Sequence, residues 1–288
     1  MLIARNSSAD GPSTRERART VTSARSAVRV GAKWAQRWLR RERRLERLLH
    51  RFTKLESAAT RYSHELIVPM NSTYSPWYDD VAFRAVYNAI AGNSFVDQYK
   101  CYELWEQLGQ LRHLDGDILE VGVWRGGTGV LLARRAQQLG MAATVVLADT
   151  FQGVTKAGVE DPWYQGGEHA DTSVSVVNEL AGRLGVEVEI LEGIFPDDTG
   201  HLVEERRFRF VHIDVDVYES AKHVWEWVWP RLCVGGTVLW DDYGSFECEG
   251  VVTLGRELLD QSLSSVRLIH NLNGHLVLAK LTDGPLYE

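Results

Sequence analysis

Short apolar runs that end in glycine or aspartate alternate with helix-length segments from about residue 117 onwards, and this alternation constrains the fold most strongly. Such an alternation is typical of right-handed β-α-β crossovers, which build a parallel sheet covered by helices on both faces. We expect strands at 117–123, 143–149, 186–191, 209–214, 237–241, 266–271 and 275–281. We expect helices at 78–91, 95–111, 127–139, 172–184, 220–231 and 250–263.

The last two strand-like runs are joined by Asn273 and Gly274, a pair that favours a tight hairpin turn. A hairpin cannot be all-parallel, so one edge of the sheet should contain an antiparallel strand. We therefore predict an α/β fold with a doubly wound, mostly parallel sheet and one antiparallel strand, together with a helical N-terminal extension.

The charge is distributed unevenly along the chain. Residues 1–54 carry 15 Lys and Arg against four Asp and Glu, whereas residues 55–288 carry 17 against 35. This split predicts a basic arm on an acidic body. We divide the chain into a disordered basic tail (1–24), a basic amphipathic helix (25–60), a helical cap (61–115) and a ligand-binding domain (116–288).

The basic helix has an apolar stripe, because Trp38, Leu45 and Phe52 recur at intervals of seven. We favour the interpretation that this stripe packs on the body of the protein or on a second subunit, which would make the protein a homo-oligomer. Peripheral contact of its arginine-rich face with a membrane surface is the alternative.

Composition excludes several classes of protein. No run of about 18 apolar residues is present, so no transmembrane helix is expected. An acidic body repels nucleic acid, and no nucleic-acid partner is predicted. Cys101, Cys233 and Cys248 are too few and too far apart for a disulfide framework or a zinc cluster, which favours a reducing, cytoplasmic location.

The first strand of the sheet runs into a glycine-rich turn, GVWRGGTG at residues 122–129. Glycines between a strand and a helix allow a ligand to approach the backbone, but they also serve a tight turn alone, and both interpretations stay open. The spacing differs from GxGxxG, which disfavours a nucleotide pyrophosphate. Glu120 lies in the end of the strand, where a carboxylate would attract an ammonium group.

Asp149 ends the next strand, 29 residues after Glu120. A carboxylate at this place can accept hydrogen bonds from both hydroxyls of a ribose, as in nucleotide-binding sheets. An isolated strand-end aspartate is often only a helix cap, but its position after the glycine turn favours the ribose role.

Acidic residues end two strands that should be neighbours, Asp214 on one and Asp241 and Asp242 on the other. Each of them alone could cap a helix. Three adjacent carboxylates repel one another unless a cation or protons neutralise them, and oxygen ligands favour a hard cation such as Mg²⁺. Asp216 lies either on the same face as Asp214 or in the following loop.

Several motifs, taken together, resemble the macrocin O-methyltransferase family, the metal-dependent sugar O-methyltransferases of macrolide and aminocoumarin biosynthesis. They cover about residues 85–250 in the family's order. They read GDILEVGVWRGG (116–127), ADTFQG (148–153), GIFPD (193–197), HIDVDVYES (212–220), WPRL (229–232), GG (235–236) and DDYG (241–244), with Cys248. The chain departs from the family after Cys248, where Glu249 replaces a basic residue, and the basic arm has no counterpart.

This resemblance implies a Rossmann-like, seven-stranded methyltransferase fold with one antiparallel strand and an S-adenosylmethionine cofactor. It implies cofactor contacts from Glu120, Gly122, Trp124, Gly126, Thr128, Asp149 and Thr150, and a metal held by Asp214, Asp241 and Asp242. Methyl transfer from a sulfonium to a hydroxyl is an in-line displacement, and Asp214 or Asp216 is expected to accept the hydroxyl proton.

The acceptor favoured by these residues is a sugar diol in a glycoside or glycan, with a phenolic diol as the alternative. Catechol-type methyltransferases place a lysine three residues after the first metal-binding aspartate, and the residue here is Val217. Two alternative hypotheses are a non-catalytic interaction module and a dinucleotide or nucleotide-sugar enzyme. The complete set of site carboxylates and the missing GxGxxG argue against them.

Overall fold

The computed structural model describes residues 54–55, 60–65, 73–261 and 263–285. The predicted basic tail and nearly all of the predicted basic helix lie outside these residues. Lys54–Leu55 form the two-residue strand β1 and not the end of that helix. The chain divides into two compact units, and all features discussed below except Glu65 of β2 belong to the larger one, residues 55–64 and 74–288.

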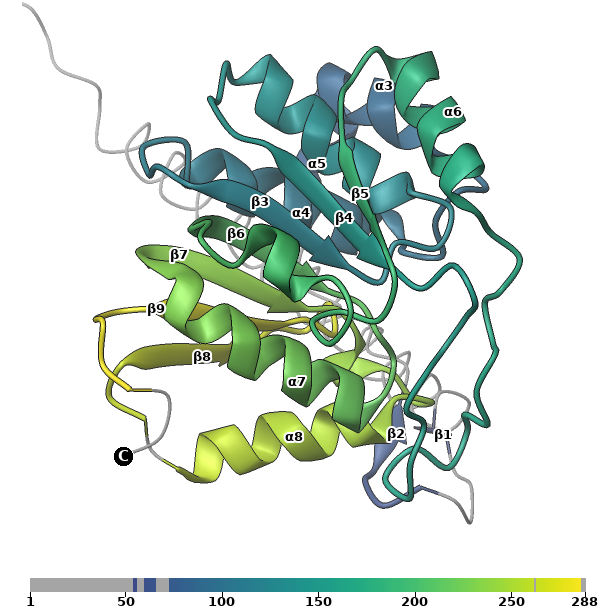
Figure 1. Ribbon diagram of the computed structural model, residues 1–288, viewed down its shortest axis with the longest axis vertical. Helices are drawn as coiled ribbons and strands as arrows, with labels where there is room; N and C mark the ends of the chain where they lie inside the picture. The colour runs from purple at the N-terminus through teal and green to yellow at the C-terminus, as the bar shows by residue number, and fades with distance from the viewer. Residues whose placement is uncertain (1–53, 56–59, 66–72, 262, 286–288) are drawn as a thin grey trace, which may run out of the picture. The chain divides into compact units, whose positions relative to one another are not determined.

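A seven-stranded sheet confirms the predicted α/β architecture within the described residues (Figure 1). Its strands are β3 (Asp117–Val121), β4 (Val145–Asp149), β5 (Glu189–Glu192), β6 (Phe208–Ile213), β7 (Leu232–Trp240), β8 (Val266–His270) and β9 (Leu276–Lys280). Their order is β5-β4-β3-β6-β7-β9-β8. Only β9 runs antiparallel to its neighbours in this sheet, as the Asn273-Gly274 turn predicts.

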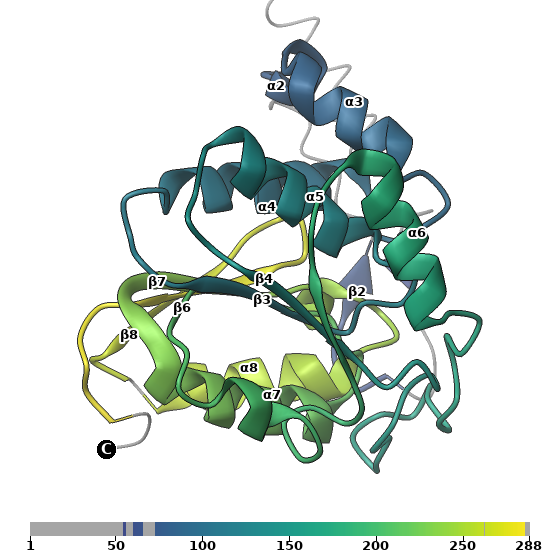
Figure 2. The same cartoon turned by 45° about the horizontal axis from the view of Figure 1, so that its top comes forward.

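Helices cover both faces of the sheet (Figure 2). Helices α4 (Gln98–Gln110), α5 (Gly127–Gln138) and α6 (Val174–Leu184) lie on one face, and α7 (Tyr218–Val228) and α8 (Glu249–Asp260) on the other. The short elements are β2 (His64–Glu65), α2 (Pro76–Asp79), α3 (Val81–Ala89) and the 3₁₀ turns at Gly200–Val203, Trp229–Arg231 and Asp242–Gly244.

The prediction of one helix over 78–91 was wrong, because the helix is interrupted at Asp80. This residue has extended backbone angles, and its carboxylate accepts the backbone N–H of Phe83 as the N-cap of α3. A capping carboxylate stabilises a helix start more than it stabilises a helix interior, so α2 ends and α3 begins here.

Alternation along the strands divides the core into two layers. Leu119 and Val211 face α7 and α8, whereas Ile118 and Phe210 face α4, α5 and α6. Trp225 and Trp229 are buried in the layer beneath α7. A sheet buried on both faces needs apolar side chains at nearly every strand position, so polar residues inside its strands need partners.

None of the described helices is long and apolar enough to span a membrane.

Candidate active site

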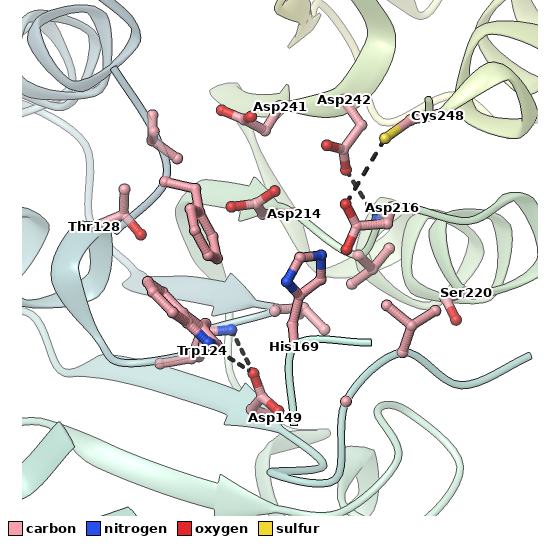
Figure 3. A pocket seen from close by; sticks show the side chains of 18 of the residues that line it. Trp124, Thr128, Asp149, His169, Asp214, Asp216, Ser220, Asp241, Asp242 and Cys248 are labelled. Atoms are coloured by element: carbon pink, nitrogen blue, oxygen red, sulfur yellow. Dashed lines mark hydrogen bonds between the residues drawn. The ribbon is translucent and has the colours of Figure 1, made fainter. Parts of the chain in front are cut away.

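A cavity of about 690 Å³ lies at the carboxyl ends of β3, β4, β6 and β7. Its volume is in the range of small-molecule sites, and parallel sheets bind ligands at this edge. Figure 3 shows side chains from the glycine turn and from the acidic strand ends around the same space. The sheet therefore brings together the sites that the sequence predicts separately.

Asp149 holds the glycine turn in place. Its Oδ2 accepts the backbone N–H groups of Val123 at 2.6 Å and Trp124 at 2.8 Å, and its Oδ1 accepts that of Phe151 at 2.7 Å. The carboxylate also lines the cavity. Its ribose role stays a prediction, and the structure adds that the same group fixes the backbone of Val123 and Trp124.

Gly122 is required by the backbone itself. Its φ is +87°, and a Cβ atom there would lie 1.7 Å from the carbonyl oxygen of Asp214. The end of β3 therefore meets the end of β6 with no room for a side chain. Of the two interpretations left open by the sequence, tight backbone packing is demonstrated here, and Gly122 also lines the cavity.

The other predicted cofactor contacts divide into two groups. Trp124, Thr128 and Thr150 line the cavity, whereas Gly126 does not. Gly126 is the left-handed N-cap of α5, with φ +83°, and a Cβ there would lie 2.9 Å from a methyl group of Val177. The left-handed turn and the close approach of α6 therefore explain why residue 126 is a glycine.

Glu120 is placed differently from the prediction. It faces the α4–α5 layer and is fully buried, and it does not line the cavity. The register pairs it with His212 on the neighbouring strand, and His212 Nδ1 lies 2.8 Å from Glu120 Oε1. Strand alternation turns this carboxylate away from the cavity, so we correct its expected role from an ammonium contact to a buried partner of His212.

The three strand-end aspartates converge as predicted. One carboxylate oxygen from each of Asp214, Asp241 and Asp242 lies within 4.8 Å of the others, and all three residues line the cavity. Asp241 and Asp242 are 5% exposed. The result is an all-oxygen cluster of a kind that suits a hard divalent cation.

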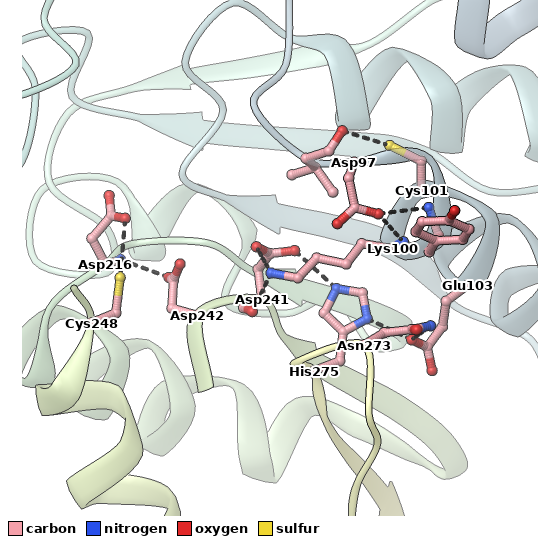
Figure 4. A network of polar contacts seen from close by, with 12 residues as sticks. Asp97, Lys100, Cys101, Glu103, Asp216, Asp241, Asp242, Cys248, Asn273 and His275 are labelled. Atoms are coloured by element: carbon pink, nitrogen blue, oxygen red, sulfur yellow. Dashed lines mark hydrogen bonds and ion pairs between the residues drawn. The ribbon is translucent and has the colours of Figure 1, made fainter. Parts of the chain in front are cut away.

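Asp241 also has cationic partners that the sequence does not suggest. Lys100 Nζ lies 2.7 Å from its Oδ2, and His275 Nε2 lies 2.9 Å from its Oδ1 (Figure 4). Glu103 Oε2 contacts the other ring nitrogen of His275 at 2.8 Å. The chain Glu103–His275–Asp241 resembles the outer hydrogen bonds that orient metal-binding groups.

These partners give the three aspartates pKa shifts in different directions. Burial opposes ionisation of Asp241, but Lys100, followed by His212 and His275, holds its pKa well below the ordinary value. Burial and then Asp241 raise the pKa of Asp214 well above the ordinary value. Burial and then Asp216 raise the pKa of Asp242 to about 8. Burial and mutual repulsion thus oppose ionisation of Asp214 and Asp242, while Asp241 stays ionised.

Asp216 lies in the loop after β6, with φ +65°, and its carboxylate lines the cavity. Its Oδ1 accepts the hydroxyl of Tyr164 at 2.9 Å and lies 3.7 Å from Cys248 Sγ. Its backbone N–H donates to Asp242 Oδ2 at 2.9 Å. Because these side-chain contacts fall on Oδ1, Oδ2 is the oxygen that can accept a proton from a ligand.

Comparison with known proteins shows the family. The sequence matches the macrocin O-methyltransferase (TylF) family over residues 92–260. The chain belongs to this family. The match includes the glycine turn and all three aspartates of the cluster.

Two curated relatives are O-methyltransferases according to their names, and the name of the first includes a rhamnosyl group. The 8-demethyl-8-(2,3-dimethoxy-alpha-L-rhamnosyl)-tetracenomycin-C 4'-O-methyltransferase of Streptomyces olivaceus is 32% identical over 148 residues, which cover 48% of this chain and 56% of that protein. The mycinamicin III 3''-O-methyltransferase of Micromonospora griseorubida is 33% identical over 154 residues, which cover 48% and 59%. The chain thus spans little more than half the length of these relatives.

Solved structures share the fold. The O-methyltransferase NovP has a TM-score of 0.57 and 22% identity, with coverage of 66% of this chain and 83% of that chain. The calicheamicin methyltransferase CalS11 has a TM-score of 0.54 and 19% identity, with coverage of 72% and 94%. At these identities the likeness concerns the fold alone, the Rossmann-like sheet of O-methyltransferases.

Glu249 is the position at which the sequence departs from the macrocin O-methyltransferase family. Its side chain binds a segment that precedes the seven-stranded sheet in the sequence. Its carboxylate accepts the backbone N–H of Arg61 at 2.6 Å and that of Tyr62 at 2.9 Å, and it lies 3.1 Å from His64 Nε2. Hydrogen bonds and His64 hold the pKa of Glu249 below the ordinary value against the effect of burial. We call residues 60–64 the anchor segment.

The anchor segment reaches the rim of the cavity. The ring of His64 packs edge-on against Phe246, a cavity-lining residue, with 5.3 Å between ring centroids. Arg61 Nη1 lies 2.7 Å from Glu160 Oε2, in the long loop between β4 and α6. The departure at Glu249 therefore has a structural reason, which is to connect this segment to α8.

Sequence reasoning missed Lys100, Glu103, Tyr164 and His275. His275 could have been found, because β9 pairs antiparallel with β7 and Trp240 lies opposite Leu276, so position 275 lies opposite Asp241. Lys100 and Glu103 lie on α4, and no local pattern indicates which helix residues reach the strand ends.

Proposed function

We propose that this protein is an O-methyltransferase that uses S-adenosylmethionine and a divalent cation, Mg²⁺ or another hard ion, to methylate a sugar hydroxyl in a glycoside or glycan. The observation that carries the proposal is that Asp214, Asp241 and Asp242 meet in the cavity that also contains the glycine turn. Family membership supports the methyl transfer, and the rhamnosyl group in the name of the first relative supports the sugar acceptor.

The residues fit a divalent cation. Asp214, Asp241 and Asp242 offer oxygen atoms within 4.8 Å of one another, and burial together with the neighbouring carboxylates raises the pKa values of Asp214 and Asp242. A bound divalent cation supplies positive charge that lowers the pKa of an acceptor hydroxyl and fixes its orientation. In this proposal these three carboxylates hold it.

The chain's own residues position the cofactor and move the proton. S-adenosylmethionine supplies an electrophilic methyl group when bound. Asp149 and the backbone of residues 122–124 shape one end of the cavity, where the cofactor's ribose would lie. Asp216 Oδ2 is our candidate acceptor for the hydroxyl proton, because Tyr164 fixes the carboxylate through Oδ1.

The test is transfer of isotopically labelled methyl from S-adenosylmethionine to a panel of glycosides and catechols, with Mg²⁺ or with a chelator. We expect label on a glycoside only when Mg²⁺ is present. Asp241→Asn should abolish transfer and leave S-adenosylhomocysteine binding by calorimetry nearly unchanged, whereas Asp260→Asn, an exposed control on α8, should retain activity. Full activity of Asp241→Asn in chelator would contradict the metal proposal. Label on catechols alone would show that the acceptor is a phenolic diol and not a sugar.

Asp216→Asn in the same assay tests the proton acceptor. Loss of a general base typically lowers the rate by about 10²- to 10⁴-fold, and we expect a loss in this range with the Mg²⁺ requirement retained. An unchanged rate would assign the proton to another group, with Asp214 as the next candidate.

A further inference from the structure

We infer that Lys100 is a positioning residue that holds the Asp241 carboxylate in the cation-free protein and releases it when a divalent cation binds. Because this ion pair must break, Lys100 lowers the affinity of the site for the cation and thereby sets it. This inference rests on the metal site of the proposed function. It concerns a residue on α4, outside the strand-end motifs.

Both oxygens of Asp241 are already bonded. Oδ1 lies 2.9 Å from His275 Nε2 and 3.6 Å from His212 Nε2, and Oδ2 lies 2.7 Å from Lys100 Nζ. A cation that uses Asp241 must therefore displace one of these partners or share an oxygen with it. Which partner yields depends on how firmly each of them is held.

The two histidines are fixed. Both are fully buried, and each has a carboxylate on its second ring nitrogen, Glu120 for His212 and Glu103 for His275, at 2.8 Å in both pairs. Asn271 Nδ2 donates to the same Glu103, which fixes the carboxylate in turn. Movement of either imidazole would break its 2.8 Å hydrogen bond to Glu120 or Glu103, which is costly for buried polar groups.

Lys100 is the movable partner. Its side chain lines the cavity and is 13% exposed, and a lysine side chain has four carbons that can rotate. Its ammonium also donates to the backbone carbonyl of Asp241 at 2.8 Å, so it has a second acceptor that does not belong to the carboxylate. Figure 4 shows the extended side chain reaching from α4 to Asp241.

Charge decides the outcome. An ammonium and a divalent cation on one carboxylate repel each other strongly in a buried site. Asp214, Asp216 and Asp242 surround the same space, so a divalent cation gains more from the cluster than the single charge of Lys100 does. Each binding event therefore includes the cost of breaking the Lys100–Asp241 ion pair, and a variant without this ammonium avoids that cost.

The first test measures Mn²⁺ binding by electron paramagnetic resonance of the free ion, in the full chain and without acceptor. We expect Lys100→Met to bind Mn²⁺ at least about tenfold more tightly than the wild type, a difference of about 1.4 kcal/mol. Lys100→Arg, which keeps the charge, should bind no more tightly than the wild type. Lys222→Met is the matched control, because Lys222 lies over the ring of Tyr218 on α7, and its affinity should equal that of the wild type.

The second test follows Lys100 itself in the wild-type protein. Reductive methylation of lysines, read by mass spectrometry of the peptide that contains Lys100, should increase when Mn²⁺ is added, because the released ammonium becomes accessible. Binding of S-adenosylhomocysteine by each variant verifies that the fold is intact.

The outcomes separate this inference from the proposed function. If Lys100→Met binds Mn²⁺ with wild-type affinity or more weakly, or if the reactivity of Lys100 does not change, the inference is overturned and the metal site stands. If neither the wild type nor Lys100→Met binds Mn²⁺, the metal site of the proposed function is overturned together with the inference.

Discussion

At the scale of single residues, the meeting of β3 and β6 at Gly122 is the tightest constraint on the site. An alanine there would place its Cβ 1.7 Å from the Asp214 carbonyl oxygen, at a φ of +87°. We expect Gly122→Ala to lower the free energy of unfolding by at least about 2 kcal/mol, because the two strand ends must separate. Urea denaturation without ligands measures this change.

Gly140 provides the matched control for this substitution. Its φ is also positive, at +63°, but a Cβ there would meet nothing within 4 Å. Gly140→Ala should therefore cost about 1 kcal/mol, the backbone strain alone. Equal losses in the two variants would show that the contact between the strand ends contributes nothing beyond the strain.

The residues of the site were predictable from the sequence only where the chain positions them locally. Asp214, Asp241 and Asp242 directly follow their strands, and the parallel register brings them together. Glu120 was misplaced because one position along a strand reverses the face that a side chain occupies. Lys100 reaches the cluster from α4, and its distance from the strands in sequence left no signal.

At the scale of elements, Glu249 connects α8 to the anchor segment. Removal of its charge by Glu249→Gln weakens hydrogen bonds to two backbone N–H groups and to His64. Hydrogen bonds to charged groups contribute about 1.5–3 kcal/mol each, and because the amide retains some of them we expect a loss of about 1–3 kcal/mol at pH 7. The matched control is Glu257→Gln on the same helix, whose exposed contact with Tyr218 should matter little.

The effect of Glu249 should depend on pH with a definite sign. The folded protein lowers the pKa of this carboxyl from 4.5, so its stabilisation is fully present above pH 4.5 and is lost as the pH falls through the folded-state value. The difference in stability between the wild type and Glu249→Gln should therefore shrink on acidification below pH 4.5. A difference that is constant between pH 7 and pH 3 would contradict the assigned role.

Elements were predicted well where burial dictates their pattern. Each strand of the sheet and each helix from α4 to α8 overlaps its expected range, because strands buried on both faces and amphipathic helices leave strong patterns, but β7 begins at Leu232 and not at the expected residue 237. The break at Asp80 and the anchor segment were missed, because a capping carboxylate and a contact 188 residues away in sequence leave no periodic pattern.

At the scale of the whole molecule, the fold places the glycine turn and the acidic strand ends around one cavity. Strand order explains this arrangement, because β3 lies between β4 and β6, and β6 pairs with β7. Homo-oligomerisation and a contact of the basic arm with a membrane stay predictions, since the arm lies outside the described residues. The departure from the family at Glu249 lies near the cavity, because the anchor segment that Glu249 holds contacts the cavity-lining Phe246.

The most direct test of this account is a crystal structure with S-adenosylhomocysteine and Mn²⁺, with the cation located by its anomalous scattering. We predict one strong anomalous peak bonded to Asp214, Asp241 and Asp242, with the ribose hydroxyls of the cofactor product on Asp149. An anomalous map without a peak among these carboxylates, at a Mn²⁺ concentration that supports methyl transfer, would contradict the account.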